Sequence, residues 1–253
     1  MIQPQIALQL YTVREWTARD MVGTLRELTA IGYQAVELAG YGGLSVPELR
    51  AALDSLGLRA IGAHVPFDRF ATEPGQVLED LQTLGCDFAV LPSLPPAQRI
   101  TSQVHGLPSM LNGWGEQCRA AGLTFAYHNH DAEFAPVRDD GARLFDLLLA
   151  GTDPALVAFE LDVYWVRFAG VDPIALLRRY PERFPLIHVK DMAADPGRSD
   201  APVGTGIIDW TAVLDAASGT RCCVVEQDHP TDALTDVTVS LRHLERILTD
   251  GAS

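Results

Sequence analysis

VAFELD, residues 157–162, is an apolar run that ends abruptly in the carboxylate of Asp162. A buried strand of a parallel barrel has this appearance when it delivers a functional side chain to the C-terminal mouth of the barrel. Three further runs have the same design: TFAYHNH (124–130) carries His128 and His130, PLIHVKD (185–191) carries His188, and CVVEQD (223–228) carries Glu226. Four such runs in one half of the chain predict a divalent-metal active site.

Strand-like and helix-like patterns alternate along the whole chain. Four more apolar runs predict strands at 6–12, 34–40, 59–65 and 88–93. Apolar residues at helical spacing predict helices at 20–32, 46–57, 75–85, 111–122, 141–151, 173–184, 209–219 and 238–250. Eight strands alternating with eight helices imply a parallel sheet with right-handed crossovers.

The length of 253 residues fits one closed (β/α)8 barrel, the TIM barrel fold. An open doubly wound sheet is the competing architecture, and it usually has a glycine-rich phosphate loop after the first strand. Here the first strand continues into QLYTVRE (9–15), which contains no glycine. Because the sequence has no linker-like stretch or break in composition, residues 1–253 are predicted to form a single domain.

Charge and composition exclude several classes of protein. The net charge is −14, with 19 Lys and Arg against 33 Asp and Glu, and the basic residues form no cluster. A nucleic-acid partner is therefore not expected, since phosphate binding needs a basic surface. No apolar run reaches the roughly 20 residues of a membrane span, and the first residues lack a signal-peptide pattern. The four cysteines form no CxxC pair, so reduced, buried thiols in a cytoplasmic protein are predicted.

Alternation along each strand indicates which side chains point into the barrel. In TFAYHNH, the bulky Phe125 and Tyr127 suit the layer between barrel and helices, which places His128 and His130 inside. The same parity predicts that the inward-facing pairs are Glu160 with Asp162, His188 with Lys190, and Glu226 with Asp228. Glu160 lies deeper than Asp162 and is expected to support the metal ligands.

Two carboxylates and one or two imidazoles form a mixed oxygen and nitrogen ligand set. Such a set is compatible with Mn, Zn, Co, Fe or Mg and does not select among them. Glu226 is also the candidate general base, if an ion binds only one of its oxygens. His64, at the end of the third strand, is a second acid–base candidate or a residue of the pocket wall. Lys190 either binds a substrate oxygen or pairs with Asp191 or Asp162.

The chain resembles the sugar phosphate isomerase/epimerase superfamily, the xylose isomerase-like TIM barrels. The motifs that carry the resemblance run from QLYTVRE through YHNHDAEF, LDVYW and HVKDM to VGTGIIDW and VVEQD. Ketose epimerases of this superfamily have Glu on strand five where this chain has His128. A shift of one residue would make Asn129 or His130 the inward group. The resemblance implies a divalent ion held by His128, Asp162, His188 and Glu226.

The same resemblance implies a sugar or polyol substrate. The lack of a phosphate-binding loop or an Arg/Lys clamp favours an unphosphorylated one. Endonuclease relatives place a second metal-ligating His where this chain has Trp165, and the acidic composition also disfavours DNA. Such barrels commonly form homo-oligomers, although no sequence feature identifies an interface. Hydrogen bonds to hydroxyl groups, or stacking on a sugar ring, are expected from Tyr11, Glu37, His130 and Trp165.

The leading hypothesis for function is a metal-dependent sugar or polyol isomerase or epimerase, which removes a proton next to a carbonyl polarised by the metal. The first alternative is an inosose dehydratase-like lyase, in which the same proton loss is followed by loss of a β-hydroxyl group. The second alternative is a sugar-binding barrel without catalytic activity. The His-rich YHNH run resembles the dehydratases as much as the epimerases, so the sequence leaves this choice open.

Overall fold

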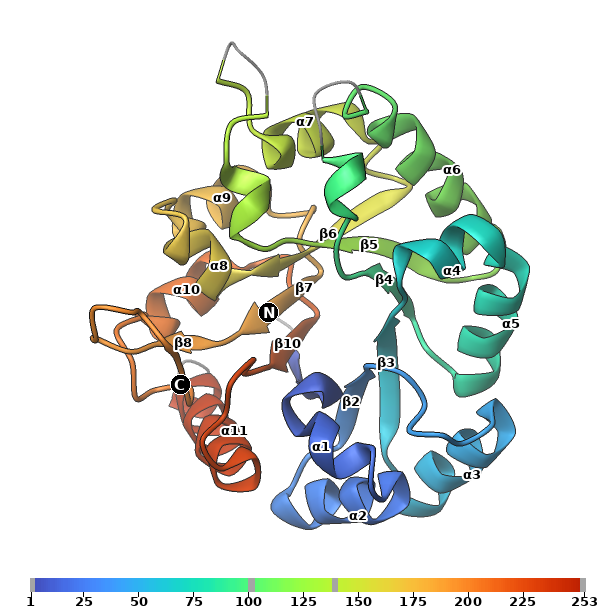
Figure 1. The fold of residues 1–253 in the computed structure, drawn as a ribbon. Helices are drawn as coiled ribbons and strands as arrows, with labels where there is room; N and C mark the ends of the chain where they lie inside the picture. Colours follow the sequence, from blue (N-terminus) through green and yellow to red (C-terminus); the bar gives the residue numbers. More distant parts are fainter. Residues whose placement is uncertain (1–2, 100–102, 138–140, 251–253) are drawn as a thin grey trace.

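A computed structural model describes residues 3–99, 103–137 and 141–250, and it confirms the predicted TIM barrel (Figure 1). Eight parallel strands close in the order β1-β10-β7-β6-β5-β4-β3-β2, and helices surround them. Two further short strands, β8 (Asp191–Met192) and β9 (Asp200–Ala201), form an antiparallel pair outside the barrel. The barrel strands are β1 (Gln5–Gln9), β2 (Ala35–Leu38), β3 (Arg59–His64), β4 (Phe88–Leu91), β5 (Thr124–His128), β6 (Val157–Asp162), β7 (Leu186–Val189) and β10 (Cys222–Val225).

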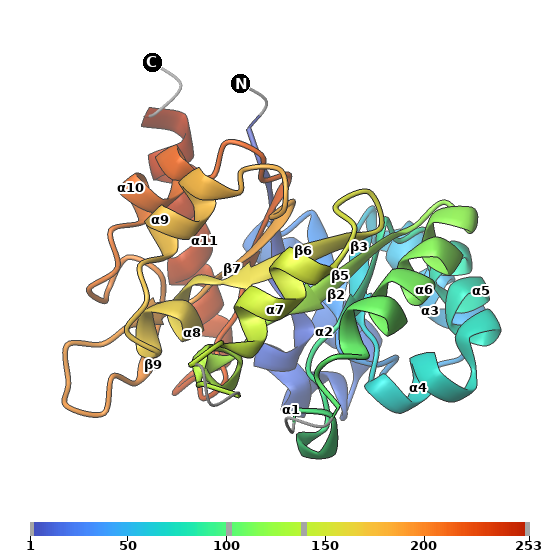
Figure 2. The same ribbon diagram turned by 90° about the horizontal axis from the view of Figure 1, so that it is seen from above.

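The eight predicted helices are all present. They are α2 (Met21–Ile31), α3 (Val46–Leu56), α5 (Pro74–Leu84), α6 (Leu107–Ala120), α7 (Leu144–Gly151), α9 (Pro173–Arg179), α10 (Trp210–Ala216) and α11 (Ala233–Asp250). α11 covers the junction of β1 and β10, where the first and last barrel strands meet (Figure 2).

Short helices that the sequence analysis did not predict follow the ends of several strands. The first strand was predicted to reach residue 12, but it ends at Gln9, where the Gln9 side chain accepts a hydrogen bond from the Tyr11 N–H. The short helices lie beyond the C-terminal ends of β1, β3, β4, β5 and β6, so they help to build the mouth of the barrel. They are η1 (Leu10–Val13), α1 (Arg14–Thr17), α4 (Phe67–Thr72), η2 (Pro96–Gln98), η3 (Asp131–Phe134) and α8 (Val163–Phe168).

The hydrophobic core has two layers. Between strands and helices lies the larger layer, which includes Phe125, Tyr127 and Cys223. The barrel interior is filled by smaller side chains around one large one, with Cys222 among them, so the two adjacent cysteines face opposite sides of β10. The interior layer consists of Ala7, Ala35, Ile61, Phe88, Val90, Ala126, Leu186, Cys222 and Val224. Within the described residues, no helix is both long and apolar enough to cross a membrane.

Asp191 anchors the irregular segment 193–208, which follows β8. Its carboxylate accepts hydrogen bonds from the backbone N–H groups of Gly204 (2.9 Å), Gly206 (3.1 Å) and Ile208 (3.1 Å). A side chain at Gly206 would collide with this carboxylate and with the Met192 carbonyl, since an added Cβ would lie 2.3 and 2.4 Å from them. Asp191 therefore binds the loop backbone, and it is not the partner of Lys190 that the sequence analysis offered as one option.

Asp191→Ala is expected to destabilise the fold, because three loop N–H groups lose a charged acceptor. We expect the free energy of unfolding in urea to fall by about 3 kcal/mol or more, given that each unsatisfied buried group costs about 1–3 kcal/mol. Asp215→Ala, at an exposed position of α10, is the matched control and should leave the unfolding midpoint unchanged. Equal midpoints for the two variants would contradict the anchoring role of Asp191.

Candidate active site

Strand register brings the four predicted metal ligands together at the barrel mouth. Asp162 pairs with His188 across β6 and β7, and His128 pairs with Glu160 across β5 and β6. Glu226 directly follows β10. One ligand atom from each of His128, Asp162, His188 and Glu226 lies within 4.8 Å of the others, and all four residues are buried. His130 does not belong to this group, so the structure brings His128 rather than His130 to the carboxylates.

Asp162 is aimed at the cluster by contacts with neighbouring elements. Its Oδ1 caps α8 by accepting a hydrogen bond from the Trp165 N–H (2.9 Å). The Asn129 amide pairs sideways with the Asp162 backbone, accepting from its N–H (3.1 Å) and donating to its carbonyl (3.4 Å). Asn129 thus continues the β5–β6 ladder and does not face inward. The remaining oxygen, Asp162 Oδ2, is buried and makes no hydrogen bond, but it is in ion-pair contact with the Lys190 ammonium, whose Nζ lies 3.2 Å away.

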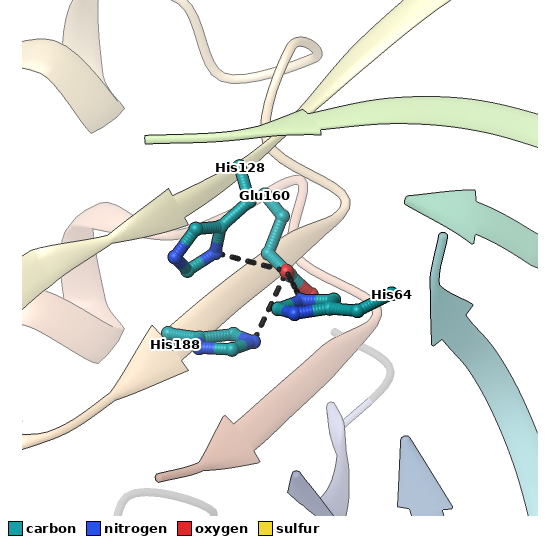
Figure 3. Close-up of side chains that lie close together, drawn as sticks. All are labelled: His64, His128, Glu160 and His188. Atoms are coloured by element: carbon teal, nitrogen blue, oxygen red, sulfur yellow. Dashed lines mark hydrogen bonds and ion pairs between the residues drawn. The ribbon is translucent and has the colours of Figure 1, made fainter. Parts of the chain in front are cut away.

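Glu160 lies beneath the ligands and contacts three imidazoles (Figure 3). Its Oε2 lies 2.9 Å from His64 Nε2, 3.0 Å from His128 Nδ1 and 3.0 Å from His188 Nε2. Glu37 reinforces this arrangement, with its Oε2 at 3.0 Å from His188 Nε2 and 3.2 Å from His64 Nε2. Because an ionised carboxylate only accepts hydrogen bonds, these ring nitrogens are the ones that carry protons.

The opposite nitrogens of His128 and His188 are thereby directed to the other two ligands. His188 Nδ1 lies 2.9 Å from Glu226 Oε2, so by the same rule it carries a proton in the metal-free protein, which a bound cation would replace; His128 Nε2 lies 3.9 Å from Asp162 Oδ2. A histidine that binds a metal usually donates its second ring N–H to a carboxylate or carbonyl in this way. His64, His128, Glu160 and His188 also form a compact group. The direct contacts of Glu160 with three nitrogens make it a support for the ligands.

Lys190, the only lysine of the chain, is fully buried beside the same ligands. Its Nζ lies 3.2 Å from Asp162 Oδ2, 2.9 Å from Glu226 Oε2 and 2.7 Å from Asp228 Oδ2. The predicted pairing with Asp162 is therefore present, together with two further carboxylates. The ammonium group occupies a position between two proposed metal ligands, which indicates that this part of the site attracts positive charge.

The pKa shifts follow from burial and from the excess of carboxylates. Burial alone would lower the pKa of His188 and of His64. Glu160 and Glu226 nevertheless hold the His188 pKa well above its usual range, and Glu37 and Glu160 raise the pKa of His64 to about 10. Burial opposes the charge of Glu226, yet Lys190 and His188 keep its pKa well below the usual range. Burial raises the pKa of Asp162 to about 6. The site contains more buried carboxylates than cationic partners, together with imidazole nitrogens. This set of oxygen and nitrogen donors fits a divalent cation.

A cavity of about 710 Å³ opens beside the cluster. Tyr11, His64 and His130, which the sequence predicted for substrate contact or acid–base chemistry, line this cavity, as does Glu226. Trp165 packs instead against His130, at 5.7 Å between ring centroids, and against the Lys190 ammonium. Glu37 lies below the cavity floor, where Gln9 Nε2 donates a hydrogen bond to it (2.7 Å). Direct contacts of Trp165 and Glu37 with a substrate stay predictions.

Four residues of the site were not assigned a role from the sequence. Asp228, which binds Lys190 and lines the cavity, shared the parity of Glu226, so that signal was present. Tyr41 and Arg69 also line the cavity, and their only sequence signal was their position after strands β2 and β3. Glu133, buried on η3, accepts hydrogen bonds from the Tyr127 hydroxyl and the His130 N–H, both at 2.8 Å. It therefore holds the backbone of His130 in place.

Comparison with known proteins agrees with this architecture. Residues 25–247 match the family model described as xylose isomerase-like TIM barrel. The chain belongs to this family. A sugar phosphate isomerase/epimerase from Parabacteroides distasonis is 26% identical and superimposes with a TM-score of 0.78, covering 96% of this chain and 94% of that one. The resemblance found in the sequence is thus confirmed.

Other proteins similar to this chain carry different names and activities. An inosose dehydratase from Geobacillus kaustophilus is 26% identical over 196 residues, which cover 68% of this chain and 62% of that protein. This chain therefore matches less than two-thirds of the length of that curated relative. An IolI protein with bound zinc has 15% identity and a TM-score of 0.76, covering 97% of this chain and 98% of that one. That level of identity supports the fold alone.

Glu160→Gln is expected to weaken divalent-cation binding about 10–100-fold, because it removes the negative charge that orients His128 and His188. Calorimetric titration of the metal-free protein with Zn²⁺ and Mn²⁺ measures the change. Glu116→Gln, at an exposed position of α6, is the control and should bind as the wild type does. Wild-type affinity in a folded Glu160→Gln variant would contradict the supporting role of Glu160.

Proposed function

We propose that this protein is a metal-dependent isomerase or epimerase of a sugar or polyol, which removes a proton from the carbon next to a carbonyl group. One observation carries the proposal. The Glu226 carboxylate belongs to the buried ligand cluster and also lines the cavity. A substrate in the cavity would therefore meet a carboxylate base beside the groups suited to hold a cation.

The proposed ligands of a divalent ion (Mn, Zn, Co, Fe or Mg) are His128, Asp162, His188 and Glu226. When bound, such an ion polarises a carbonyl or hydroxyl oxygen and so acidifies the neighbouring C–H bond. The surplus of buried carboxylates and the contact of Asp162 Oδ2 with the Lys190 ammonium support this assignment. The zinc bound in the IolI structure indicates that this fold can hold a metal.

Four side chains divide the proton chemistry in this proposal. Glu226, kept ionised by Lys190 and His188, takes the proton from carbon. His64 is cationic at neutral pH and lines the cavity, so it stabilises negative charge that develops on the substrate oxygen. Lys190 holds Glu226 and Asp228 in position and adds positive charge. Glu226 then returns the proton to carbon, and His130, neutral because burial lowers its pKa, lies on the cavity wall where it can bind a substrate hydroxyl group.

A dehydratase is the second candidate function. Its first step is the same removal of a proton by Glu226, but the electron pair then expels a β-hydroxyl group, which leaves as water after protonation by His64. The 26% sequence identity with an inosose dehydratase supports this candidate. The isomerase/epimerase match has the same identity and covers nearly the whole of both chains, whereas the dehydratase match covers 62% of that protein. We therefore place isomerisation or epimerisation first.

The proposal is tested by NMR in heavy water with a panel of ketoses and keto-inositols. The protein is tested with added Mg²⁺, Mn²⁺, Co²⁺ or Zn²⁺, and after chelation. We expect metal-dependent deuterium incorporation next to the carbonyl, together with an isomeric product. An unsaturated ketone or dione would favour the dehydratase instead. Binding of these compounds without any exchange would contradict an enzymatic role and favour a sugar-binding protein.

His64→Gln separates catalysis from metal binding, because it leaves all four proposed ligands in place. We expect the exchange rate at saturating metal to fall about 10²–10³-fold, the usual cost of losing one group that stabilises developing negative charge. Metal affinity measured by calorimetry should change much less than the rate. Glu182→Gln, at an exposed position before β7, serves as the control. An unchanged exchange rate in His64→Gln would remove His64 from the mechanism.

A further inference from the structure

The cavity extends far beyond the ligand cluster, and to one side of it. Of the strands that carry the proposed ligands, β5 contributes His128 to the wall, and the chain after β10 contributes Glu226 and Asp228. Neither Asp162 of β6 nor His188 of β7 lines it. The rest of the wall comes from Tyr11 of η1, from His130 after β5, from the ends of β2, β3 and β4, and from helices α4 and α5. A bound molecule thus reaches the cluster with one end only.

The size of the cavity exceeds the needs of a single sugar. Cavities of about 300–1,000 Å³ hold ligands of drug size, and the volume here is about 710 Å³. A six-carbon sugar placed against His128 and Glu226 would fill the reacting end. It would leave the space between the ends of β2, β3 and β4 open, so that part of the cavity has room for a second ring.

The outer part of the cavity is suited to an uncharged group. Its wall includes Tyr41, Val65, Pro66, Val77 and Pro92. Among the lining residues that the structure describes, its one permanent cation is Arg69.

That guanidinium group is already neutralised. Arg69 Nε lies 3.2 Å from Glu73, and its Nη2 lies 3.4 Å from Asp80, which also accepts a hydrogen bond from the Tyr41 hydroxyl (3.2 Å). A phosphate or carboxylate on the substrate would compete with these two acidic groups for the same cation. The charge distribution therefore disfavours an anionic substituent, while the apolar wall favours the face of a neutral ring.

We infer that the substrate is a neutral two-ring compound, in which the reacting sugar is linked to a second sugar or to an aromatic group. This inference deepens the proposed function and relies on it for the identity of the reacting ring. The reacting ring lies against His128 and Glu226, and the second ring lies on the outer wall formed by Tyr41, Pro66 and Pro92. Size selection by the outer wall then discriminates between linked and free sugars.

Binding of unoxidised sugars tests the inference without turnover. Methyl, phenyl and glucosyl glucosides are titrated into the protein, with affinity measured by calorimetry and ring contact by saturation-transfer NMR. We expect the phenyl or the glucosyl compound to bind at least 10-fold more tightly than the methyl compound. The preferred one of the two identifies the second ring as aromatic or as a sugar. Equal affinities, or no detectable binding of any of them, would overturn the inference.

Substitutions that fill the outer part provide the second arm. Ser93→Trp, after β4, and Ala39→Trp, after β2, each place a bulky group into the cavity from an exposed position. We expect either variant to abolish the preference for the larger ligands and to leave binding of methyl glucoside unchanged. Ser109→Trp, at an exposed position of α6 away from the cavity, is the control. A preference that survives in both folded cavity variants would contradict the assigned position of the second ring.

The two proposals fail in different ways. Ring selectivity without deuterium exchange into any oxidised sugar would contradict the proposed function and retain the outer-ring site. Deuterium exchange into free ketoses by a protein that shows no ring selectivity would support the proposed function and contradict the outer-ring site.

Discussion

Negative charge buried at the mouth of a closed barrel is the constraint on which the site depends. Glu37, Glu160, Asp162 and Glu226 are all buried there, and Asp228 is next to them. A buried ion costs several kcal/mol unless it is paired, so their partners are not incidental. Lys190 and His188 supply part of the compensation. Because Glu160 engages one ring nitrogen of each histidine, the second nitrogens of His128 and His188 point at the remaining carboxylates. A shared divalent cation would complete the compensation.

The barrel converts this electrostatic arrangement into a site with two separate ends. Register between β5, β6 and β7 determines the height of His128, Asp162 and His188, and the cap that Asp162 forms on α8 links one ligand to the helix above it. The side of the mouth formed by β2, β3 and β4 carries none of the four proposed ligands. It is lined by apolar residues, and Arg69 is held by Glu73 and Asp80. In the proposed account, proton transfer and recognition of the second ring are therefore carried by different strands of one barrel.

Much of this could be predicted from the sequence because local patterns decide it. Apolar runs alternating with helical spacing predict a barrel, and parity along β5 and β6 places His128 and Glu160 inside. Pairings set by barrel closure could not be predicted. A register shift between Val36 and Glu37 pairs Glu37 with Gly62, and Glu37 reaches beneath His188. Lys190, which follows β7, contacts carboxylates after β10 as well as Asp162, because β7 lies between β6 and β10 in the sheet. The short helices after the strands have too few residues for a periodic signal.

The central claim is that His128, Asp162, His188 and Glu226 share one cation, and Lys190 offers the most direct test. As the only lysine of the chain, it gives a single side-chain NMR signal after selective ¹³C-lysine labelling. Its ammonium touches two of the four proposed ligands, so Zn²⁺ binding must change its surroundings. We expect this signal to shift saturably at one equivalent of Zn²⁺, and Asp162→Asn to abolish the shift. Stoichiometric zinc binding that leaves the Lys190 signal unchanged would contradict the account.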